Sequence, residues 1–455
     1  MENFLIDKIT LHNFKKFEEL TVCFNQQMNV LVGKNASGKT TVLEAATVIA
    51  GAMLSSFKEY VPSRFVQNLS DSDVRLKNQT AVALRKSAGN QSRVAPLVAA
   101  MVQQYPCNIA ADIVWDEKKA RCVRSLEKAG GRTKFDGDNP FRHIVGEWEE
   151  AIRAADGRDS DYIFPIVLYL SSARLWNENR GGQDLQTLPN RYDAYQRCLD
   201  RKRGSQLAFM YLKLLQNLAA EETEGKPLGA YRVILEAVNY AMQGELADGQ
   251  MVKYSSRYGE FVLGEKDGSL QRFETLSDGY RNVIKIIVDI AARMCILNPY
   301  LAEDALQQTP GIVMIDELDL SLHPTWQKRM VDILKTLFPK VQFICATHSP
   351  FIIQSLSDGE LCVMGESLTD EYSGRSIEDI AEDIMKVSMP AYSDRKKAMF
   401  EAATAYLQAL KSADSPEQIA KLKERADLLE AEYSDNPAYY ALLRMKWLEK
   451  KASIE

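Results

Sequence analysis

The sequence predicts an α/β protein, a mixed sheet flanked by helices, with helical insertions and a helical C-terminal region. Three observations lead to this fold class. Largely apolar runs at 28–32, 311–315 and 342–347 are typical of strands buried on both faces of a parallel sheet. A glycine-rich loop joins the first run to a helix-forming segment. Apolar residues after 278 and 415 recur at spacings of three and four, which is the helical period.

The loop at 33–40 is a complete G-x-x-x-x-G-K-[ST] motif, and it has the strand-to-helix context that the motif requires. Glycines at both ends let the backbone N–H groups point at the β- and γ-phosphates of a nucleotide. Lys39 is expected to supply a positive charge to these phosphates, and the Thr40 hydroxyl to ligate magnesium. The sequence therefore predicts a site for ATP and Mg²⁺, whose binding residues are Gly33, Lys34, Asn35, Ala36, Ser37, Gly38, Lys39, Thr40 and Thr41.

A second group of candidates follows the strand at 311–315, which ends in Asp316 and Glu317. Asp316 is expected to hold the magnesium ion, and Glu317 to polarise the attacking water. His348 follows the strand at 342–347, from where its imidazole could reach a γ-phosphate. The alternatives are a solvated acidic pair and a structural histidine. Lys39, Glu317 and His348 are the predicted catalytic residues.

The segment at 275–281 reads Thr-Leu-Ser-Asp-Gly-Tyr-Arg and precedes a long helical pattern. It resembles the signature motif of ABC-type ATPases, which implies an ABC-type P-loop ATPase head. In that motif a serine hydroxyl and a glycine amide at a helix N-terminus, here Ser277 and Gly279, meet a γ-phosphate held by another subunit. The resemblance thus implies a homo-oligomer, a dimer of heads or a multiple of it. The alternative is a serine-capped helix without such a contact.

Further segments narrow the resemblance. Residues 9–17 look like the opening strand of RecF, SMC and OLD-type ATPases, approximately N-F-[RK]-x-F, which implies that Lys15 belongs with the nucleotide-binding residues. Residues 316–327 are similar to the D-E-x-x-x-x-L-H-P-x-W-Q segment of bacterial stand-alone members. The segments that resemble the PtuA-type ATPases of Septu anti-phage systems are 191–212, 276–282 and 297–299.

This resemblance implies a regulatory ATPase of an anti-phage defence complex, whose nuclease activity comes from a separate HNH-type partner such as PtuB. The sequence itself contains no H-N-H, P-D-[DE]-x-K or other nuclease cluster.

The motifs depart from those of ABC transporters at several positions. Asp278 and Tyr280 replace the glycine and glutamine that transporters usually have, and His323 stands where transporters have an aspartate. No Q-loop glutamine is evident, and Asn108 and Asp112 occupy the expected region.

Two other functions stay open: a RecF-like DNA-repair ATPase, and the nucleotide-binding subunit of a transporter. The long internal elaboration and the His-Pro-Thr-Trp-Gln segment at 323–327 argue against the transporter. No apolar run reaches the roughly 18 residues of a membrane span, and no signal peptide is evident, so we expect a cytoplasmic protein without a membrane partner. The seven cysteines form no C-x-x-C pair, which favours reduced thiols.

The net charge of −6 argues against general binding of polyanions, so any contact with nucleic acid must come from local basic clusters. Two clusters qualify, and the alternative for each is a solvated face. The first consists of Lys118, Lys119, Arg121, Arg124, Lys128, Arg132 and Lys134, and the second of Arg197, Arg201, Lys202 and Arg203.

The phosphate loop and the acidic strand are far apart in sequence, which predicts one discontinuous ATPase head from 1–55 and 270–368. Residues 56–160 should form a helical and strand elaboration, and 161–269 a core strand with a helical insertion. Related ATPases place an arginine-leucine-tryptophan like that at 174–176 after a core strand. This resemblance implies that Arg174 contacts phosphate or a neighbouring head; the alternative is a structural ion pair. The finer expectations are a mainly helical 57–105, a strand pair at 107–128, and helices at 205–220 and 230–243.

Residues 376–455 form a predicted helical region, a possible docking site for a partner. Ser376 should cap one helix, and Ser415 and Pro416 should start another. The apolar stripes should pack against each other or against an effector; they comprise Ile419, Leu422, Ala426, Leu429 and Tyr433, followed by Tyr440, Leu443, Trp447 and Leu448.

Overall fold

The computed structural model divides the chain into two compact units, Met1–Arg375 and Ser376–Glu455. The residues that the structure describes are 3–57, 60–80, 99–116, 118–154, 162–175, 185–201, 206–221, 227–244, 246, 250–255, 258, 260–264, 267–272, 275–364, 374–433 and 437–454.

A five-stranded parallel sheet forms the centre of the first unit, in the order β15-β3-β14-β13-β9. These strands are β15 (Leu361–Val363), β3 (Met28–Val32), β14 (Val341–Ala346), β13 (Gly311–Ile315) and β9 (Ile166–Leu170). Every residue of β3, β9, β13 and β14 is buried, as their apolar sequences predicted. Because the strands are parallel, the segments that follow them emerge at one edge.

A second, antiparallel sheet has the order β2-β1-β6-β7-β8. It consists of β2 (Phe17–Cys23), β1 (Phe4–Phe14), β6 (Cys107–Trp115), β7 (Lys118–Leu126) and β8 (Lys134–Phe135). The expected mixed set of strands is thus divided between two sheets, and the strand pair predicted at 107–128 is confirmed. The buried Gln342 of β14 joins the sheets, because its side chain accepts from Ile6 N and donates to Ile6 O, each at 2.8 Å.

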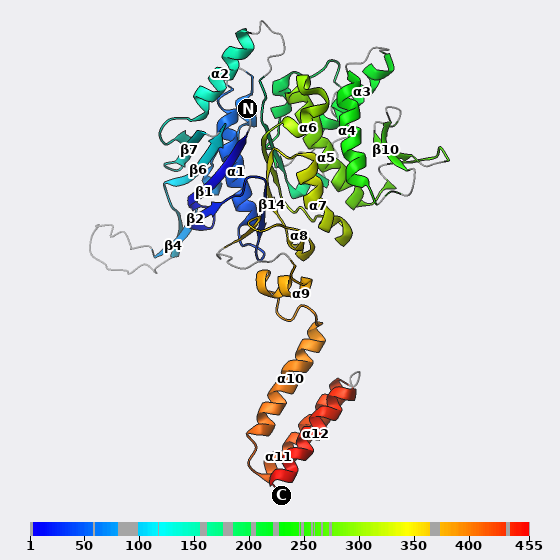
Figure 1. The fold of residues 1–455 in the computed structure, drawn as a ribbon. Coiled ribbons are helices and arrows are strands. Elements are labelled where there is room, and N and C mark those ends of the chain that lie inside the picture. Colours follow the sequence, from blue (N-terminus) through cyan, green and yellow to red (C-terminus); the bar gives the residue numbers. More distant parts are fainter. Residues whose placement is uncertain are drawn as a thin grey trace, which may run out of the picture. The chain divides into compact units, whose positions relative to one another are not determined.

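Helix α1 (Lys39–Leu54) continues the phosphate loop and packs on strands of both sheets (Figure 1). Nearly all of its residues are buried, including the carboxylate-bearing Glu44. An all-round apolar sequence such as 42–54 is what a helix enclosed on several sides requires. The phosphate loop therefore stands on a helix with little freedom to move.

The elaborations differ in part from the prediction for 57–105. The described residues there form two short 3₁₀ turns, Ser63–Phe65 and Asp71–Asp73, and an antiparallel pair, β4 (Leu76–Thr80) with β5 (Ala99–Gln103). The expectation of mainly helical structure is wrong for these residues, because pairing between distant segments overrides their local helical propensity. Residues 81–98 lie outside the described part.

Helices cover the parallel sheet on the β9 side. Helix α5 (Asp278–Leu297) contacts β9 and is itself covered by α3 (Gln206–Glu221) and α4 (Pro227–Met242), which confirms the two predicted helical segments. A small antiparallel sheet follows α4, in the order β10-β11-β12. The remaining elements are α2 (Phe141–Ala154), β10 (Met251–Ser255), β11 (Glu260–Gly264), β12 (Leu270–Arg272), α6 (Ala305–Gln308), α7 (Pro324–Leu337) and α8 (Pro350–Gln354).

The second unit is helical: α9 (Ile377–Asp379), a π-helical turn (Ile380–Ile384), α10 (Asp394–Lys411), α11 (Pro416–Glu432) and α12 (Pro437–Ile454). Ser376 and Ser415 cap their helices as predicted, accepting from Asp379 N and Gln418 N. The stripe from Ile419 to Tyr433 is buried against residues of α10 and α12, whereas Leu448 is 54% exposed. In the described part of the chain, no helix combines the length and the apolar character needed to span a membrane.

Candidate nucleotide-binding site

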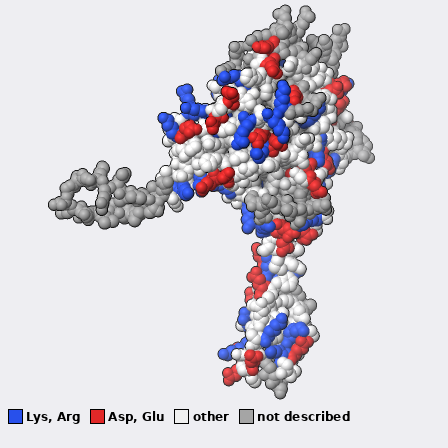
Figure 2. Space-filling view, turned by 60° about the vertical axis from the view of Figure 1, so that its left-hand side comes forward, with Lys and Arg blue, Asp and Glu red and all other residues white. Residues whose placement is uncertain are grey.

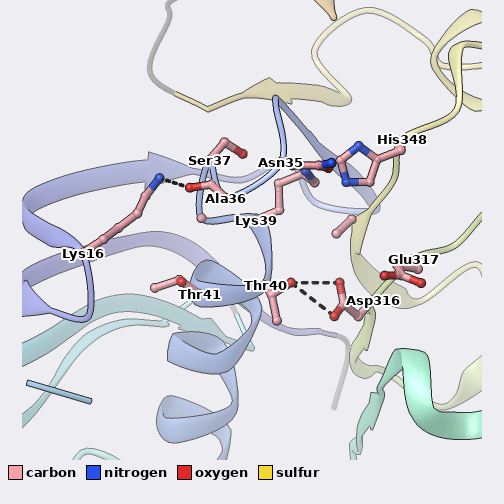
Figure 3. Close-up of a pocket in the computed structure, with 12 residues that line it drawn as sticks. Lys16, Asn35, Ala36, Ser37, Lys39, Thr40, Thr41, Asp316, Glu317 and His348 are labelled. Atoms are coloured by element: carbon pink, nitrogen blue, oxygen red, sulfur yellow. Dashed lines mark hydrogen bonds between the residues drawn. The ribbon is translucent and has the colours of Figure 1, made fainter. Parts of the chain in front are cut away.

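A cavity of about 310 Å³ lies at the edge where the parallel strands end (Figure 3). It brings together the phosphate loop after β3, the acidic pair after β13 and the histidine after β14. Its lining residues are Lys16, Asn35, Ala36, Ser37, Gly38, Lys39, Thr40, Thr41, Asp316, Glu317, Ala346 and His348. Segments separated by some 300 residues in sequence thus share one pocket, because strands β3, β14 and β13 are neighbours.

The hairpin between β1 and β2 holds the phosphate loop in place. Gly38 has a φ of 104°, and a Cβ there would lie 2.4 Å from the Phe17 ring, so only glycine fits. The Lys16 ammonium donates a hydrogen bond to the Ala36 carbonyl of the same loop (Figure 3). The Phe17 ring and the Lys16 ammonium thus both hold the phosphate loop in position.

Lys39 is buried, and its ammonium donates to the carbonyl oxygens of Gly33 at 2.9 Å and Lys34 at 3.4 Å. Burial lowers the pKa of Lys39, and the carboxylates of the acidic segment that begins at Asp316 oppose this shift. Phosphate oxygens could replace these two carbonyls as acceptors and would also satisfy the charge of Lys39.

Thr40 and Asp316 face each other across the pocket, and the threonine hydroxyl lies 3.2 Å from both carboxylate oxygens (Figure 3). Burial raises the pKa of Asp316, while the Thr40 hydrogen bond, the Arg174 charge and the Lys39 charge oppose the shift. A hydroxyl and a carboxylate are the hard oxygen ligands that Mg²⁺ prefers, with further positions left to nucleotide and water. The donor set therefore fits magnesium.

Glu317 lines the same pocket and is exposed within it. Its backbone has a φ of 49°, in the left-handed region, which is uncommon for a residue with a long side chain. Such conformations persist only where the surroundings enforce them. The turn is closed by a hydrogen bond of 3.0 Å from Leu320 N to Glu317 O.

His348 also lines the pocket, and its position depends on Asp319, which the sequence analysis did not single out. One carboxylate oxygen of Asp319 accepts from the Thr347 hydroxyl at 2.6 Å and from the His348 backbone N–H at 3.1 Å. Asp319 thus ties the end of β14 to the turn that carries Glu317. The sequence signal was present, since Asp319 is the third acidic residue after the buried strand.

The structure places Lys15 differently from Lys16. Lys15 forms an ion pair with Glu44 of α1, which is paired at 2.6 Å with Arg201 as well, and Lys15 is not among the residues that line the pocket. Burial lowers the pKa of Lys15. The neighbouring Lys16 contacts the phosphate loop instead.

Ser277 and Gly279, which we call the signature corner, are not brought to the phosphate pocket of their own chain. Ser277 is exposed at the N-terminus of α5 and borders a separate cavity of about 260 Å³. Gly279 is buried, and a Cβ there would lie 2.8 Å from the Ser321 carbonyl. This glycine therefore also has a packing role that the motif alone did not reveal.

Arg174 does not line the phosphate pocket, and none of the hydrogen bonds given for its guanidinium ends on a carboxylate oxygen. It is 4% exposed and donates to Asn282 and to the carbonyls of Ser171, Asp316 and Glu317. These hydrogen bonds are not the expected ion pair, whereas the expected contact with phosphate or a neighbouring head stays a prediction. Trp176, which follows it, lies outside the described residues.

The two residues in the expected Q-loop region lie elsewhere. Asn108 and Asp112 belong to β6 of the antiparallel sheet, and Asp112 is paired at 2.8 Å with Lys8. Neither lines the phosphate pocket. His323 caps α7, where its ring accepts from Thr325 N.

The first basic cluster is partly used within the fold. Arg124 is buried, donates to Asn68 at 2.6 Å and stacks on Phe135 at 4.2 Å, while Lys119 and Arg121 lie near acidic partners. In the second cluster Arg201 pairs with Glu44, and Lys202 and Arg203 lie outside the described residues. On the face in Figure 2, basic and acidic side chains alternate rather than segregate.

Comparison with known proteins gives two family matches: an AAA domain at residues 8–226, and a second AAA domain, named for the AbiEii toxin of a type IV toxin–antitoxin system, at 201–354. The "Retron Vc95 probable ATPase" of Vibrio cholerae serotype O1 biovar El Tor is 24% identical over 404 residues, covering 79% of this chain and 73% of that protein. The "Septu protein PtuA" of Bacillus mycoides (strain KBAB4) is 38% identical over 130 residues, covering 29% of this chain and 17% of that protein.

Among solved structures, an SMC head bound to the C-winged helix domain of ScpA aligns over 78% of this chain and 90% of its own, with 14% identity and a TM-score of 0.42. The fold assignment rests instead on the strand order and on the motifs at the strand ends. The phosphate loop, the acidic strand and the histidine strand are adjacent in the order expected of an ABC-type head. Together with the family matches and the partial likeness to PtuA, this arrangement supports a PtuA-type ATPase of the ABC/SMC/RecF/OLD-like superfamily.

Proposed function

We propose that this chain is the ATP-binding and ATP-hydrolysing regulatory subunit of a cytoplasmic anti-phage defence complex. In this proposal, ATP joins two heads face to face, and the joined state controls a separate HNH-type nuclease of the PtuB kind. The likeness to a Septu and a retron protein supports the defence setting. The Septu likeness spans 17% of that protein.

One observation carries the two-headed arrangement: the hydroxyl of Ser277 makes no capping hydrogen bond with its own helix. Other serine-capped α-helices in the described part of the chain do use the serine oxygen in this way; the capping residues are Ser349, Ser376, Ser393 and Ser415. Ser277 is exposed, and its position at the N-terminus of a 20-residue helix favours a negative ligand. A phosphate held by a second head would meet these requirements.

The pocket supports the following chemistry. The loop N–H groups and Lys39 would hold the β- and γ-phosphates of ATP. Magnesium, held by Thr40 and Asp316, would neutralise charge on those phosphates. Glu317 would orient a water molecule and accept its proton as the new bond to the γ-phosphorus forms, while the bond to ADP breaks. His348 would donate a hydrogen bond to the transferred phosphoryl group.

The proposal is tested by Glu317→Gln in the presence of Mg²⁺ and ATP. The variant should still bind ATP, should accumulate as a dimer, and should lose roughly 10²- to 10⁴-fold in kcat, as expected for loss of a general base. Light scattering after gel filtration reports the mass, and phosphate release reports kcat. Glu378→Gln, an exposed carboxylate of the second unit, is the matched control. A monomer at saturating ATP, or turnover at the wild-type rate, would contradict the proposal.

Control of a nuclease partner is tested separately, by co-expressing this chain with an HNH-type protein encoded by a neighbouring gene. Nuclease activity of the co-purified complex should change when ATP is added, and Lys39→Ala should abolish that response. The RecF-like alternative is favoured by the opening strand at 9–17 and predicts a different outcome. Gapped duplex DNA would then stimulate hydrolysis by the isolated chain, and no nuclease would co-purify.

A further inference from the structure

Arg174 occupies an unusual position behind the acidic turn. It lies in the 3₁₀ turn Ser172–Leu175, directly after β9, the strand that pairs with β13. Its guanidinium is buried and donates four hydrogen bonds to oxygen atoms from three separate segments of the chain. These are Asn282 Oδ1 at 2.8 Å, Ser171 O at 3.0 Å, Asp316 O at 2.6 Å and Glu317 O at 2.8 Å.

Two of these bonds fix the backbone of Glu317. The carbonyls of Asp316 and Glu317 belong to the peptide planes on either side of the Glu317 Cα atom, and φ and ψ describe rotation between those planes. A planar guanidinium that holds both carbonyls therefore holds both angles. This explains how Glu317 keeps a φ of 49°, and with it the direction of its carboxylate into the pocket.

The remaining side-chain bond leads to the helix of the signature corner. Asn282, fully buried in α5, accepts from Arg174 Nε and donates its own amide N–H to Leu320 O at 2.7 Å. The Cβ-free face of Gly279 meets the Ser321 carbonyl in the same turn. The start of α5 and the turn from Asp316 to Leu322 thus form one hydrogen-bonded body.

Burial lowers the pKa of Arg174 to about 10, and the carboxylates of Asp316 and Glu317 oppose this shift, so the side chain stays charged at neutral pH. Each of its three guanidinium nitrogens donates to a protein oxygen, and Arg174 does not line the phosphate pocket. A direct role on phosphate is therefore ruled out by the geometry, and a role through other residues remains.

We propose that Arg174 is a positioning residue that couples the two nucleotide sites of a head dimer. When the signature corner of one protomer closes on the nucleotide of its partner, α5 moves, and Asn282 and Arg174 transmit that movement to Glu317 of the same protomer. Glu317 serves the other nucleotide, so closure at one site prepares hydrolysis at the second. This inference rests on the proposed function, since it requires two heads.

The test compares Arg174→Gln with the wild type in ATP affinity, kcat and cooperativity. Arg174→Gln should lower kcat by about 10- to 100-fold, the range for residues that orient a catalytic group, with less than about threefold change in ATP affinity. The Hill coefficient of hydrolysis should fall from above one, with a maximum of about two for two sites, to about one. Asn282→Leu, which breaks only the helix side, should lose the cooperativity with a smaller loss of kcat.

Arg293→Gln is the matched control. Like Arg174, Arg293 is 4% exposed, and it lies on α5, the helix that carries Asn282. Its guanidinium donates to Asp289 at 2.9 Å and to the Ala194 carbonyl, and not to the acidic turn. It should lower the melting temperature without changing kcat or cooperativity. If Arg174→Gln does not fold, Asn282→Leu decides the question, and wild-type cooperativity in that variant overturns the inference.

Two further outcomes overturn the coupling. The first is that folded Arg174→Gln has the kcat and the Hill coefficient of the wild type. The second is that Arg174→Gln and Arg293→Gln lower kcat and the Hill coefficient by the same amount. Dimerisation of the wild type on ATP is measured first, which separates the two hypotheses. Failure to dimerise would reject the proposed function, whereas a dimer that hydrolyses ATP without cooperativity would reject only the coupling.

Discussion

The phosphate pocket and the signature corner are the two parts of this chain suited to meet a nucleotide, and they differ in how completely they are built. In the pocket, the main polar side chains already have partners: Lys39 holds the Gly33 carbonyl, and Thr40 holds Asp316. At the corner, the exposed Ser277 hydroxyl is not used by its own helix. We expect the pocket to bind phosphate by itself. The corner does not reach that pocket, so we expect its donors to meet a phosphate held by another protomer.

The difference indicates a division of tasks. The pocket stands on α1, which is enclosed by both sheets, so its geometry is set before any ligand arrives. The corner is placed on the N-terminus of α5, whose first turn is joined to the acidic turn. Binding should therefore depend on the pocket alone, and turnover on both.

The largest effect is expected at the pocket. Lys39→Ala removes the buried ammonium, so ATP affinity should fall by roughly 10- to 100-fold, the range for a lost charged hydrogen bond. Titration calorimetry with Mg²⁺ and ATP measures the change. Lys77→Ala, an exposed lysine of β4, should bind as the wild type does. Tight binding by Lys39→Ala would mean that the pocket does not hold the phosphates.

The division of tasks itself is tested by mixing two inactive variants, Lys39→Ala and Ser277→Arg. A mixed dimer has one intact composite site, from the loop of one protomer and the corner of the other. Independent sites would restore about a quarter of the wild-type rate on random mixing, and the coupling proposed for Arg174 would lower the recovery below that value. Mass spectrometry of the native mixture confirms exchange, and no recovery in an exchanged mixture would contradict a site built from the loop of one protomer and the corner of the other.

A smaller effect concerns the junction between the corner and the acidic turn. Gly279→Ala would bring a Cβ to 2.8 Å from the Ser321 carbonyl, so the free energy of unfolding should fall by about 1–3 kcal/mol. Gly146→Ala is the control, because a Cβ in that helix meets nothing within 4 Å. It should instead gain roughly 0.5–1 kcal/mol. Urea unfolding measures both, and equal stability of the two variants would contradict the close approach.

The smallest effect is on the stability of the nucleotide-free pocket. Burial raises the pKa of Asp316, so its charged form destabilises the folded state. Asp316→Asn should therefore melt slightly higher than the wild type. The difference should be absent below the ordinary pKa of aspartate and should grow as pH rises through the raised value.

The same variant should lose the strengthening of ATP binding by Mg²⁺, and with EDTA it should bind ATP as the wild type does. Asp332→Asn, an exposed aspartate of α7, is the control. A melting temperature that is lower at every pH would show that Asp316 stabilises the empty pocket.

The sequence was sufficient to predict the parts of the site whose positions follow from local rules. The phosphate loop, Asp316, Glu317 and His348 each follow a buried strand, and parallel strands bring their ends to one edge. Lys15 and Lys16 were harder to distinguish, because φ is positive at Asn13 and Lys15 and the simple alternation of a strand fails there. Arg174 could not be interpreted because its partner Asn282 is 108 residues away, and long-range pairing is invisible to a local pattern.

The central claim is that the signature corner completes a nucleotide site on a second protomer. A cryo-EM structure of Glu317→Gln with Mg²⁺ and ATP tests it most directly, through the distance from Ser277 Oγ to the γ-phosphate held by the partner. The account predicts hydrogen-bond contact, about 3 Å, at both sites. A nucleotide-loaded structure in which Ser277 faces solvent, with no phosphate within reach, would contradict it.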